Sequence, residues 1–203
     1  MRIVLTMLKR TVARRAQRIF WIYLHNNFVI ADKSNFRMTE ATIKCTFVPI
    51  TLDSCFRVLD FREQRRVAEY REKVGNGEVG FFAECDTGMV GSIWATINRT
   101  RARSVARMHM PLMPNEALIH DIVTAETCRG MGVGPFMIGQ MASKLLDEYR
   151  VNRIIIDVSC KNHSSLRMME KVGLESKERV FSLSFCGKLA FRRNLKTTSG
   201  ARC

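Results

Sequence analysis

A run of alternating glycines joins an apolar strand to a helix in the middle of this chain. The segment Leu118 to Gly139 reads L-I-H-D-I-V-T-A-E-T-C-R-G-M-G-V-G-P-F-M-I-G. Gly130, Gly132 and Gly134 have no Cβ to keep ligand oxygens away from the backbone. The helix that follows directs free N–H groups and the positive end of its dipole into the same space. The sequence therefore predicts a fold in which a strand leads through a phosphate-binding turn into a helix.

Two familiar glycine-rich loops do not fit this spacing. A Walker loop needs Gly-Lys followed by Ser or Thr, and no lysine or hydroxyl residue closely follows Gly134. A dinucleotide fingerprint needs G-x-G-x-x-G, whereas the spacing here is G-x-G-x-G after Arg129. The remaining pattern, Arg129-x-x-Gly132-x-Gly134, resembles the loop with which the GNAT superfamily of N-acetyltransferases binds the pyrophosphate of acetyl-CoA.

A second segment strengthens this resemblance. Residues 153 to 174 read R-I-I-I-D-V-S-C-K-N-H-S-S-L-R-M-M-E-K-V-G-L. GNAT enzymes have here a strand, an Asn, a Ser or Ala three residues later, and a short helix ending in Glu-Lys-x-Gly-Phe. The matching residues are Asn162, Ser165, Glu170, Lys171 and Gly173, with Leu174 in place of the aromatic residue. The likeness in strands and helices extends from about residue 42 to about residue 192.

The resemblance implies an α/β fold of the α+β kind, with a mixed, mostly antiparallel central sheet flanked by helices. Its domain would cover residues 38–195, after a basic extension of helix and strand over residues 1–37 and before a disordered tail at 196–203. Strands are expected at 41–50, 78–85, 89–98, 117–124, 153–159, 180–186 and 188–192. Helices are expected at 51–59, 62–73, from the glycine loop to 149, and at 162–172. Residues 99–115 are expected to form a loop.

The family resemblance also implies which residues bind acetyl-CoA. In GNAT enzymes the fourth strand splays from the fifth, and its exposed amides hold the acyl carbonyl and the pantetheine arm. The residues expected to bind the coenzyme are Ile122, Val123, Thr124, Arg129, Gly130, Met131, Gly132, Val133, Gly134, Asn162 and Ser165. Ser165 could cap its helix instead. No metal is expected, because the sequence has no cysteine and histidine cluster at zinc-ligand spacing.

Three residues are candidates for the catalytic base. His120 and Asp121 alternate along one strand, so only one of them is expected to face the acceptor cleft. Glu84, near the end of a neighbouring strand, is the third candidate. The general acid is a departure from the family, since many GNAT enzymes have a tyrosine where this chain has Met169 or its neighbour Met168. Either another group protonates the thiolate or the chain binds acyl-CoA without efficient turnover.

Composition limits the compartment and the number of domains. The 203 residues, 46% of them hydrophobic, suffice for one well-buried domain. Seven cysteines are scattered without a C-x-x-C pair, and this odd number favours a reducing, cytoplasmic location.

The net charge of +14 is concentrated near the N-terminus, where residues 1–37 hold eight Lys or Arg and one acid. Apolar and basic residues over 1–20 alternate at helical spacing, which predicts a basic amphipathic helix. This helix could pack on the domain or a second subunit, lie on an anionic membrane, or serve as a transit peptide. The following segment, 19–30, is interrupted by His25, Asn26 and Asn27, so it is too short to span a membrane and is expected to form a strand.

Two functions are consistent with these patterns. The first is transfer of an acetyl group from acetyl-CoA to the primary amine of a small acceptor, such as an amino sugar or a nucleotide-linked amino sugar, because the basic charge would attract a phosphorylated molecule. A peptide N-terminus is a rival acceptor. The second is a binding module that attaches to an anionic membrane or nucleic acid. Nucleic acid is disfavoured, since the basic segments lack interleaved aromatic residues. The sequence does not decide between a monomer and a homodimer.

Overall fold

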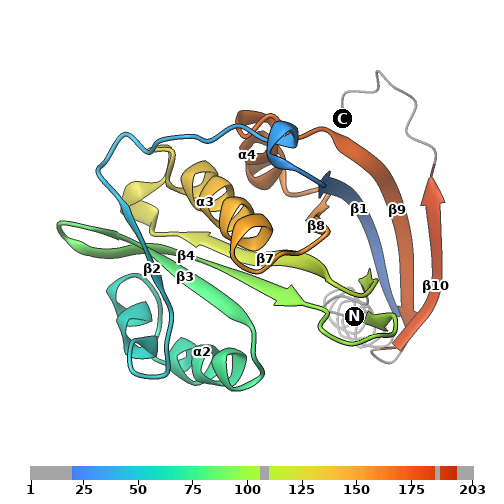
Figure 1. Ribbon diagram of the computed structural model, residues 1–203, viewed down its shortest axis with the longest axis horizontal. Helices are drawn as coiled ribbons and strands as arrows, with labels where there is room; N and C mark the ends of the chain where they lie inside the picture. The colour runs from blue at the N-terminus through green and yellow to red at the C-terminus, as the bar shows by residue number, and fades with distance from the viewer. Residues whose placement is uncertain (1–19, 106–109, 186–187, 196–203) are drawn as a thin grey trace, which may run out of the picture.

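The computed structural model describes residues 20–105, 110–185 and 188–195. Its main feature is an eight-stranded sheet with the order β10-β9-β1-β8-β7-β4-β3-β2 (Figure 1). The strands are β1 (Phe20–Ile30), β2 (Thr46–Pro49), β3 (Val79–Cys85), β4 (Gly88–Ile97), β7 (Glu116–Thr124), β8 (Arg153–Ser159), β9 (Ser176–Phe185) and β10 (Lys188–Leu195). Of the strand pairs in this sheet, only β7 and β8 run parallel. The predicted mixed, mostly antiparallel sheet is confirmed.

Helices cover both faces of the sheet. The longer helices are α2 (Arg65–Gly75), α3 (Val133–Asp147) and α4 (His163–Lys171), and the short 3-10 helices are η1 (Lys33–Asn35), η2 (Cys55–Asp60) and η4 (Glu126–Cys128). In Figure 1, α3 and α4 lie on one face and α2 with η2 on the other. Successive side chains of β4 point to opposite faces of the sheet. Ile93 therefore packs in the core that contains residues of α3, and Trp94 packs against Tyr70 of α2.

Several expected elements differ in extent. The helix expected over 51–59 is the short 3-10 helix η2, and the strand expected at 180–186 begins at Ser176, as part of β9. The strand expected over 41–50 is limited to β2, because Thr42 N donates to Met131 O at 2.8 Å and so joins this segment to the glycine loop instead of the sheet. The loop expected over 99–115 contains a small antiparallel pair, β5 (Ser104–Val105) with β6 (Pro111–Leu112). The helix predicted over 1–20 falls on residues 1–19, outside the described part, and so does the tail at 196–203.

The strand predicted near the N-terminus is confirmed as β1, and it lies inside the sheet. It pairs antiparallel with β8 on one side and with β9 on the other. Its buried apolar residues Phe28 and Ile30 belong to the same core as α3. Residues 20–30 therefore share one sheet with the predicted domain of residues 38–195.

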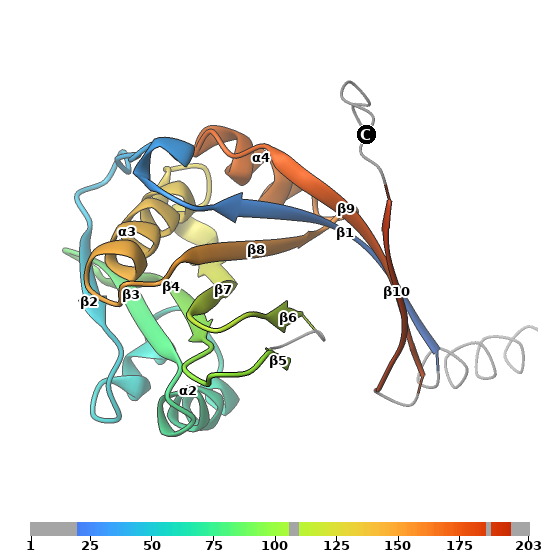
Figure 2. The same cartoon turned by 45° about the vertical axis from the view of Figure 1, so that its right-hand side comes forward.

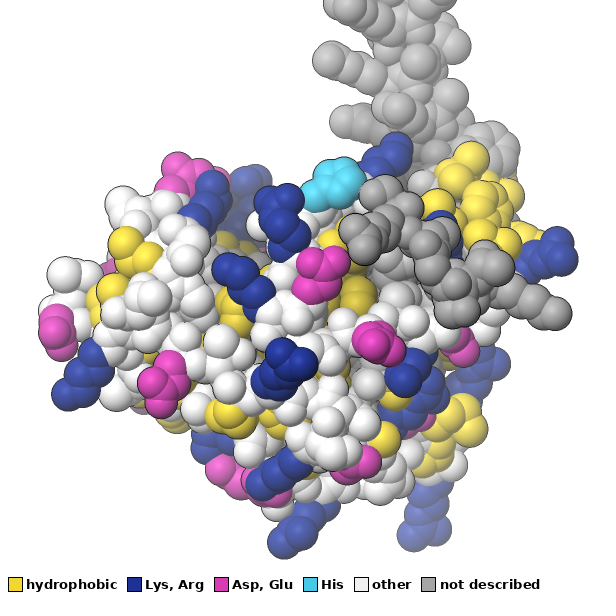
Figure 3. Space-filling model, turned by 90° about the horizontal axis from the view of Figure 1, so that it is seen from above, with side chains coloured by type: hydrophobic (Ala, Val, Ile, Leu, Met, Phe, Trp, Pro, Cys, Tyr) yellow, Lys and Arg dark blue, Asp and Glu magenta, His cyan; other side chains and the backbone are white. Residues whose placement is uncertain are grey.

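Parts of β1, β9 and β10 project beyond the helical layers as a three-stranded arm (Figure 2). Large apolar side chains on this arm are exposed, among them Ile22, Leu24, Phe185 and Phe191. Figure 3 shows hydrophobic side chains gathered at the end of the molecule where Figure 1 places β9 and β10. Within the described ranges, no helix is both long enough and apolar enough to cross a membrane.

Candidate active site

The parallel strands β7 and β8 separate part of the way along their length. Their pairing runs from Glu116 opposite Arg153 to Ile119 opposite Ile156, while β7 continues to Thr124 paired with β4 alone. A cavity of about 220 Å³ lies at this separation and is lined by residues of β7, β8 and α4. The backbone edge of β7 beyond Ile119 is thus released from β8, as the family resemblance implied.

A bulge at Asp121 changes the direction of the side chains on β7. Ser92 pairs with Val123 and Trp94 with His120, so two residues of β7 lie opposite Ile93 alone. Asp121 has a φ of 50°, a left-handed conformation that interrupts the alternation of a strand.

Both candidates, His120 and Asp121, therefore point to the α2 side of the sheet and line the 220 Å³ cavity. His120 lies opposite Trp94, which packs on α2, and Asp121 contacts α2 through Lys73. The expectation that only one of them could face this cleft is wrong, because the bulge adds a residue to the strand.

His120 lies beside Thr96 and Glu78. Its Nε2 lies 2.9 Å from Thr96 Oγ1 and 3.2 Å from Glu78 Oε2, and the side chains of His120 and Glu78 are only 11% and 12% exposed. Glu78 was not among the predicted site residues. Its position just before β3 gives no sequence signal, because the contact depends on how β3, β4 and β7 align.

Asp121 is neutralised by cations of the α2 layer. Lys73 forms a buried ion pair with its carboxylate, and Arg62 Nη1 lies 3.8 Å from Oδ1. Burial alone would raise the pKa of Asp121, but the hydrogen bond and charge of Lys73, with Arg62, hold this pKa below its ordinary value. The Lys73 ammonium in turn lies over the rings of Tyr70 and Trp94, 5.2 and 4.8 Å from their centroids. Asp121 is thus held as an anion and is a weak base.

Glu84, the third predicted base, lies elsewhere. Its carboxylate accepts from Arg57 Nη1 at 2.7 Å, on η2. It lines neither the cavity between β7 and β8 nor the larger cavity beside the glycine loop.

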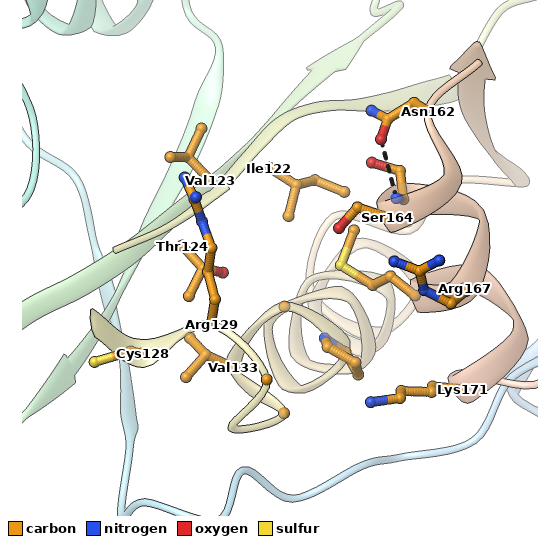
Figure 4. A pocket seen from close by; sticks show the side chains of 16 residues that line it. Ile122, Val123, Thr124, Cys128, Arg129, Val133, Asn162, Ser164, Arg167 and Lys171 are labelled. Atoms are coloured by element: carbon orange, nitrogen blue, oxygen red, sulfur yellow. Dashed lines mark hydrogen bonds between the residues drawn. The ribbon is translucent and has the colours of Figure 1, made fainter. Parts of the chain in front are cut away.

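The second cavity, of about 630 Å³, is formed by the end of β7, the glycine loop and α4 (Figure 4). Ten of the eleven predicted coenzyme-binding residues line it: Ile122, Val123, Thr124, Arg129, Gly130, Gly132, Val133, Gly134, Asn162 and Ser165. Met131 does not, because its carbonyl faces Thr42. The structure thus places these ten residues around one cavity, and their contact with the coenzyme remains a prediction.

The glycines of the loop suit an anionic guest. Gly130 and Gly132 have φ values of 85° and 79°, which other residues rarely adopt, and α3 begins directly after Gly132. A Cβ on Gly134 would lie 2.4 Å from Met168 Sδ. The first N–H groups of α3 have no partners within the helix, so the loop can accept a pyrophosphate.

Three cations surround this cavity. Arg129 follows η4 and contacts Glu126 at 3.1 Å, while Arg167 and Lys171 extend from α4 toward the start of α3 in Figure 4. Arg167 and Lys171 were not among the predicted site residues, although their spacing of four residues puts them on one face of a helix.

Asn162 has a structural contact of its own. Its Oδ1 accepts from Ser165 N at 3.1 Å and so caps α4, which makes Asn162, and not Ser165, the cap. At the expected position of a tyrosine acid, Met169 is fully buried in the core, and Met168 lines both cavities. Neither cavity has a tyrosine among its described lining residues.

Comparisons with known proteins identify the fold. An acetyltransferase of the GNAT family from Colwellia psychrerythraea has 12% identity and a TM-score of 0.58, covering 82% of this chain and 57% of that chain. A GNAT acetyltransferase from Novosphingobium aromaticivorans has 11% identity and a TM-score of 0.55, covering 80% and 63%. A Drosophila protein has 9% identity and a TM-score of 0.56, covering 90% and 57%.

These identities establish the fold alone, and this chain spans less than two thirds of the length of each of these three neighbours. A search of the curated proteins gave no match. The sequence model described as the acetyltransferase (GNAT) family matches residues 47–174, more than half of the chain. The protein therefore belongs to the GNAT acetyltransferase family.

Proposed function

We propose that this protein transfers an acetyl group from acetyl-CoA to the primary amine of a small acceptor. The observation that carries the proposal is the junction of the two cavities, which share the lining residues Ile122, Asn162, Ser165 and Met168. A coenzyme whose pyrophosphate lies on the glycine loop would extend its thioester along β7 toward this junction. An amine in the smaller cavity would meet the thioester there.

The reaction is a direct transfer. The neutral amine attacks the thioester carbonyl carbon, a C–N bond forms, the C–S bond breaks, and sulfur leaves with the bonding electron pair. Backbone N–H groups at the free edge of β7, over residues 122–124, would polarise the carbonyl and stabilise the oxyanion. The nitrogen loses one proton and the thiolate gains one, so the products are an amide and free coenzyme A.

His120 is the base that the geometry favours. It lines the acceptor cavity, and the carboxylate of Glu78 beside it would stabilise the imidazolium formed when it takes a proton. Asp121 is neutralised by Lys73, and Glu84 lies outside the cavity. Neither Met168 nor Met169 can donate a proton, so the thiolate would take its proton from water.

The acceptor is expected to be small and polar. The cavity between β7 and β8 has room for an amino group and a few neighbouring atoms, and the net charge of +14 favours an acceptor that carries phosphate, such as a phosphorylated or nucleotide-linked amino sugar. The alternative of a membrane-bound or nucleic-acid-bound module rests on residues 1–20, of which 1–19 lie outside the described part. The reducing, cytoplasmic location expected from the cysteines is retained in this proposal.

The test measures coenzyme binding and turnover separately. Calorimetry with acetyl-CoA should give saturable binding in the intact chain, and an amine panel monitored by thiol release should identify an acceptor. His120→Asn should lower kcat at least about 100-fold while leaving coenzyme binding unchanged. Absence of saturable binding at millimolar acetyl-CoA would overturn the assignment.

A further inference from the structure

A row of polar side chains crosses three strands beside the acceptor cavity. Asn27 of β1 lies opposite Asp157 of β8 on one side and opposite Glu178 of β9 on the other. Residues directly opposite each other in paired strands point to the same face of the sheet. Asp157 is two residues beyond Ile155, whose side chain packs with Leu118 on the α2 side of the sheet. The row therefore faces the same side as His120.

Two oxygen atoms in this row lack hydrogen-bond donors. Asp157 Oδ1 and Asn27 Oδ1 are both buried, and neither has a hydrogen-bond partner among the described residues. Leaving a buried acceptor unpaired costs about 1–3 kcal/mol, and more for a charged group. Two such oxygens on directly paired residues are suited to a ligand that brings several N–H donors.

His25 lies beside the Asp157 carboxylate, on the side of Oδ2. Its Nδ1 lies 3.0 Å from Asp157 Oδ2, and the two side chains are 9% and 12% exposed. With Oδ2 facing the imidazole, Oδ1 is the oxygen left for a ligand. Arg192, the nearby cation, has Met110 Sδ as its described hydrogen-bond acceptor and forms no described ion pair with Asp157.

The row lies between two spaces. Asp157 lines the 220 Å³ cavity with His120, while Asn27 and Glu178 line a neighbouring cavity of about 440 Å³. The 440 Å³ cavity is also lined by Arg103 and Arg192, so its lining carries charges of both signs. A ligand whose amino end occupied the 220 Å³ cavity would place the rest of a polar molecule in the 440 Å³ cavity.

We propose that Asp157 Oδ1 and Asn27 Oδ1 bind the ammonium group of the acceptor, with His25 as a positioning residue. The inference rests on the proposed acetyl transfer and narrows its substrate to an unhindered primary amine that enters as a cation. His120 then takes one proton from the bound ammonium, and the neutral amine attacks the thioester. β1, which precedes the family match at residues 47–174, thus supplies part of the acceptor site.

The first experiment detects binding without catalysis. Methylammonium chloride is titrated into the intact protein, and the imidazole signals of His25 are followed by NMR, with methanol as the uncharged control. Saturable shifts with methylammonium alone are expected, and their loss is expected in the isosteric Asp157→Asn variant. The matched control is Asp147→Asn, which changes an exposed carboxylate of α3. No response of His25 in the unaltered protein would overturn the site.

The second experiment uses kinetics with glucosamine as acceptor. Asp157→Asn should raise the KM for glucosamine about tenfold or more and leave the KM for acetyl-CoA unchanged. His25→Leu should do the same, whereas His25→Asn, which keeps an N–H near the Nδ1 position, should retain most of the activity. Equal effects of His25→Leu and His25→Asn would overturn the positioning role. Normal methylammonium binding without any acetyl transfer would instead overturn the proposed function and leave the cation site in place.

Discussion

Lys73 and Asp121 form a buried ion pair that joins α2 to the bulge of β7. Lys73→Met should destabilise the protein by about 3 kcal/mol, the lower end of the usual cost of leaving a buried charge unpaired, because Arg62 stays 3.8 Å from the carboxylate. Urea unfolding followed by tryptophan fluorescence would measure the change. The double variant Lys73→Met with Asp121→Asn should recover part of the loss, and equal stabilities of the single and double variants would contradict the pairing.

The same carboxylate should contribute to the acid sensitivity of the fold. The folded-state pKa of Asp121 is below its ordinary value of 3.8, so its contribution to stability is complete above that pH and is lost as the pH falls toward the lowered pKa. Asp121→Asn should therefore reduce the dependence of the unfolding free energy on pH below about pH 4. Asn is a suitable replacement because it tolerates a positive φ. Parallel pH profiles for the two proteins would contradict this assignment.

The sequence allowed the local parts of the site to be predicted because they are continuous in the chain. The strand, the turn of glycines and the helix that form the coenzyme cavity follow each other within residues 118–139, and their conformations depend on local properties such as φ at Gly132. The strands expected at 78–85 and 89–98 were predictable for the same reason, since they are continuous segments that follow each other in the chain and form β3 and β4.

The acceptor side could not be predicted because it depends on pairing between distant residues. His25 meets Asp157 only because β1 enters the sheet between β8 and β9, and no periodicity in residues 20–30 specifies that position. The bulge at Asp121 is equally hidden, because the sequence of β7 has no glycine or proline to mark the extra residue. The contact of Glu78 with His120 is hidden as well, because it depends on how β3, β4 and β7 align.

A side chain at Gly134 should weaken coenzyme binding while Met168 is present. Gly134→Ala would bring a methyl group within 2.4 Å of Met168 Sδ, so it should displace this side chain into the coenzyme cavity and raise the KM for acetyl-CoA about tenfold. Adding Met168→Ala should restore much of the binding. Gly75→Ala, where a Cβ meets nothing within 4 Å, is the control for a glycine substitution that should be silent. A harmless Gly134→Ala would show that this contact does not shape the site.

Arg167 and Lys171 should attract the phosphates of the coenzyme. Both line the cavity beside the glycine loop and are exposed to solvent, so their effect should be electrostatic and screened by salt. Arg167→Glu and Lys171→Glu should each weaken acetyl-CoA binding about tenfold at low ionic strength, as measured by calorimetry. The difference from the unaltered protein should shrink at 1 M salt, where the Debye length is about 3 Å.

The matched control for these charge reversals is Arg65→Glu. Arg65 is an exposed arginine of α2, in the layer on the other face of the sheet, and it does not line the coenzyme cavity. This variant has the same change in net charge as Arg167→Glu, so it isolates position from overall charge. If all three variants weaken binding equally, the attraction comes from the net charge of the protein. If only Arg167→Glu and Lys171→Glu do so, α4 supplies the phosphate contacts that the glycine loop alone does not.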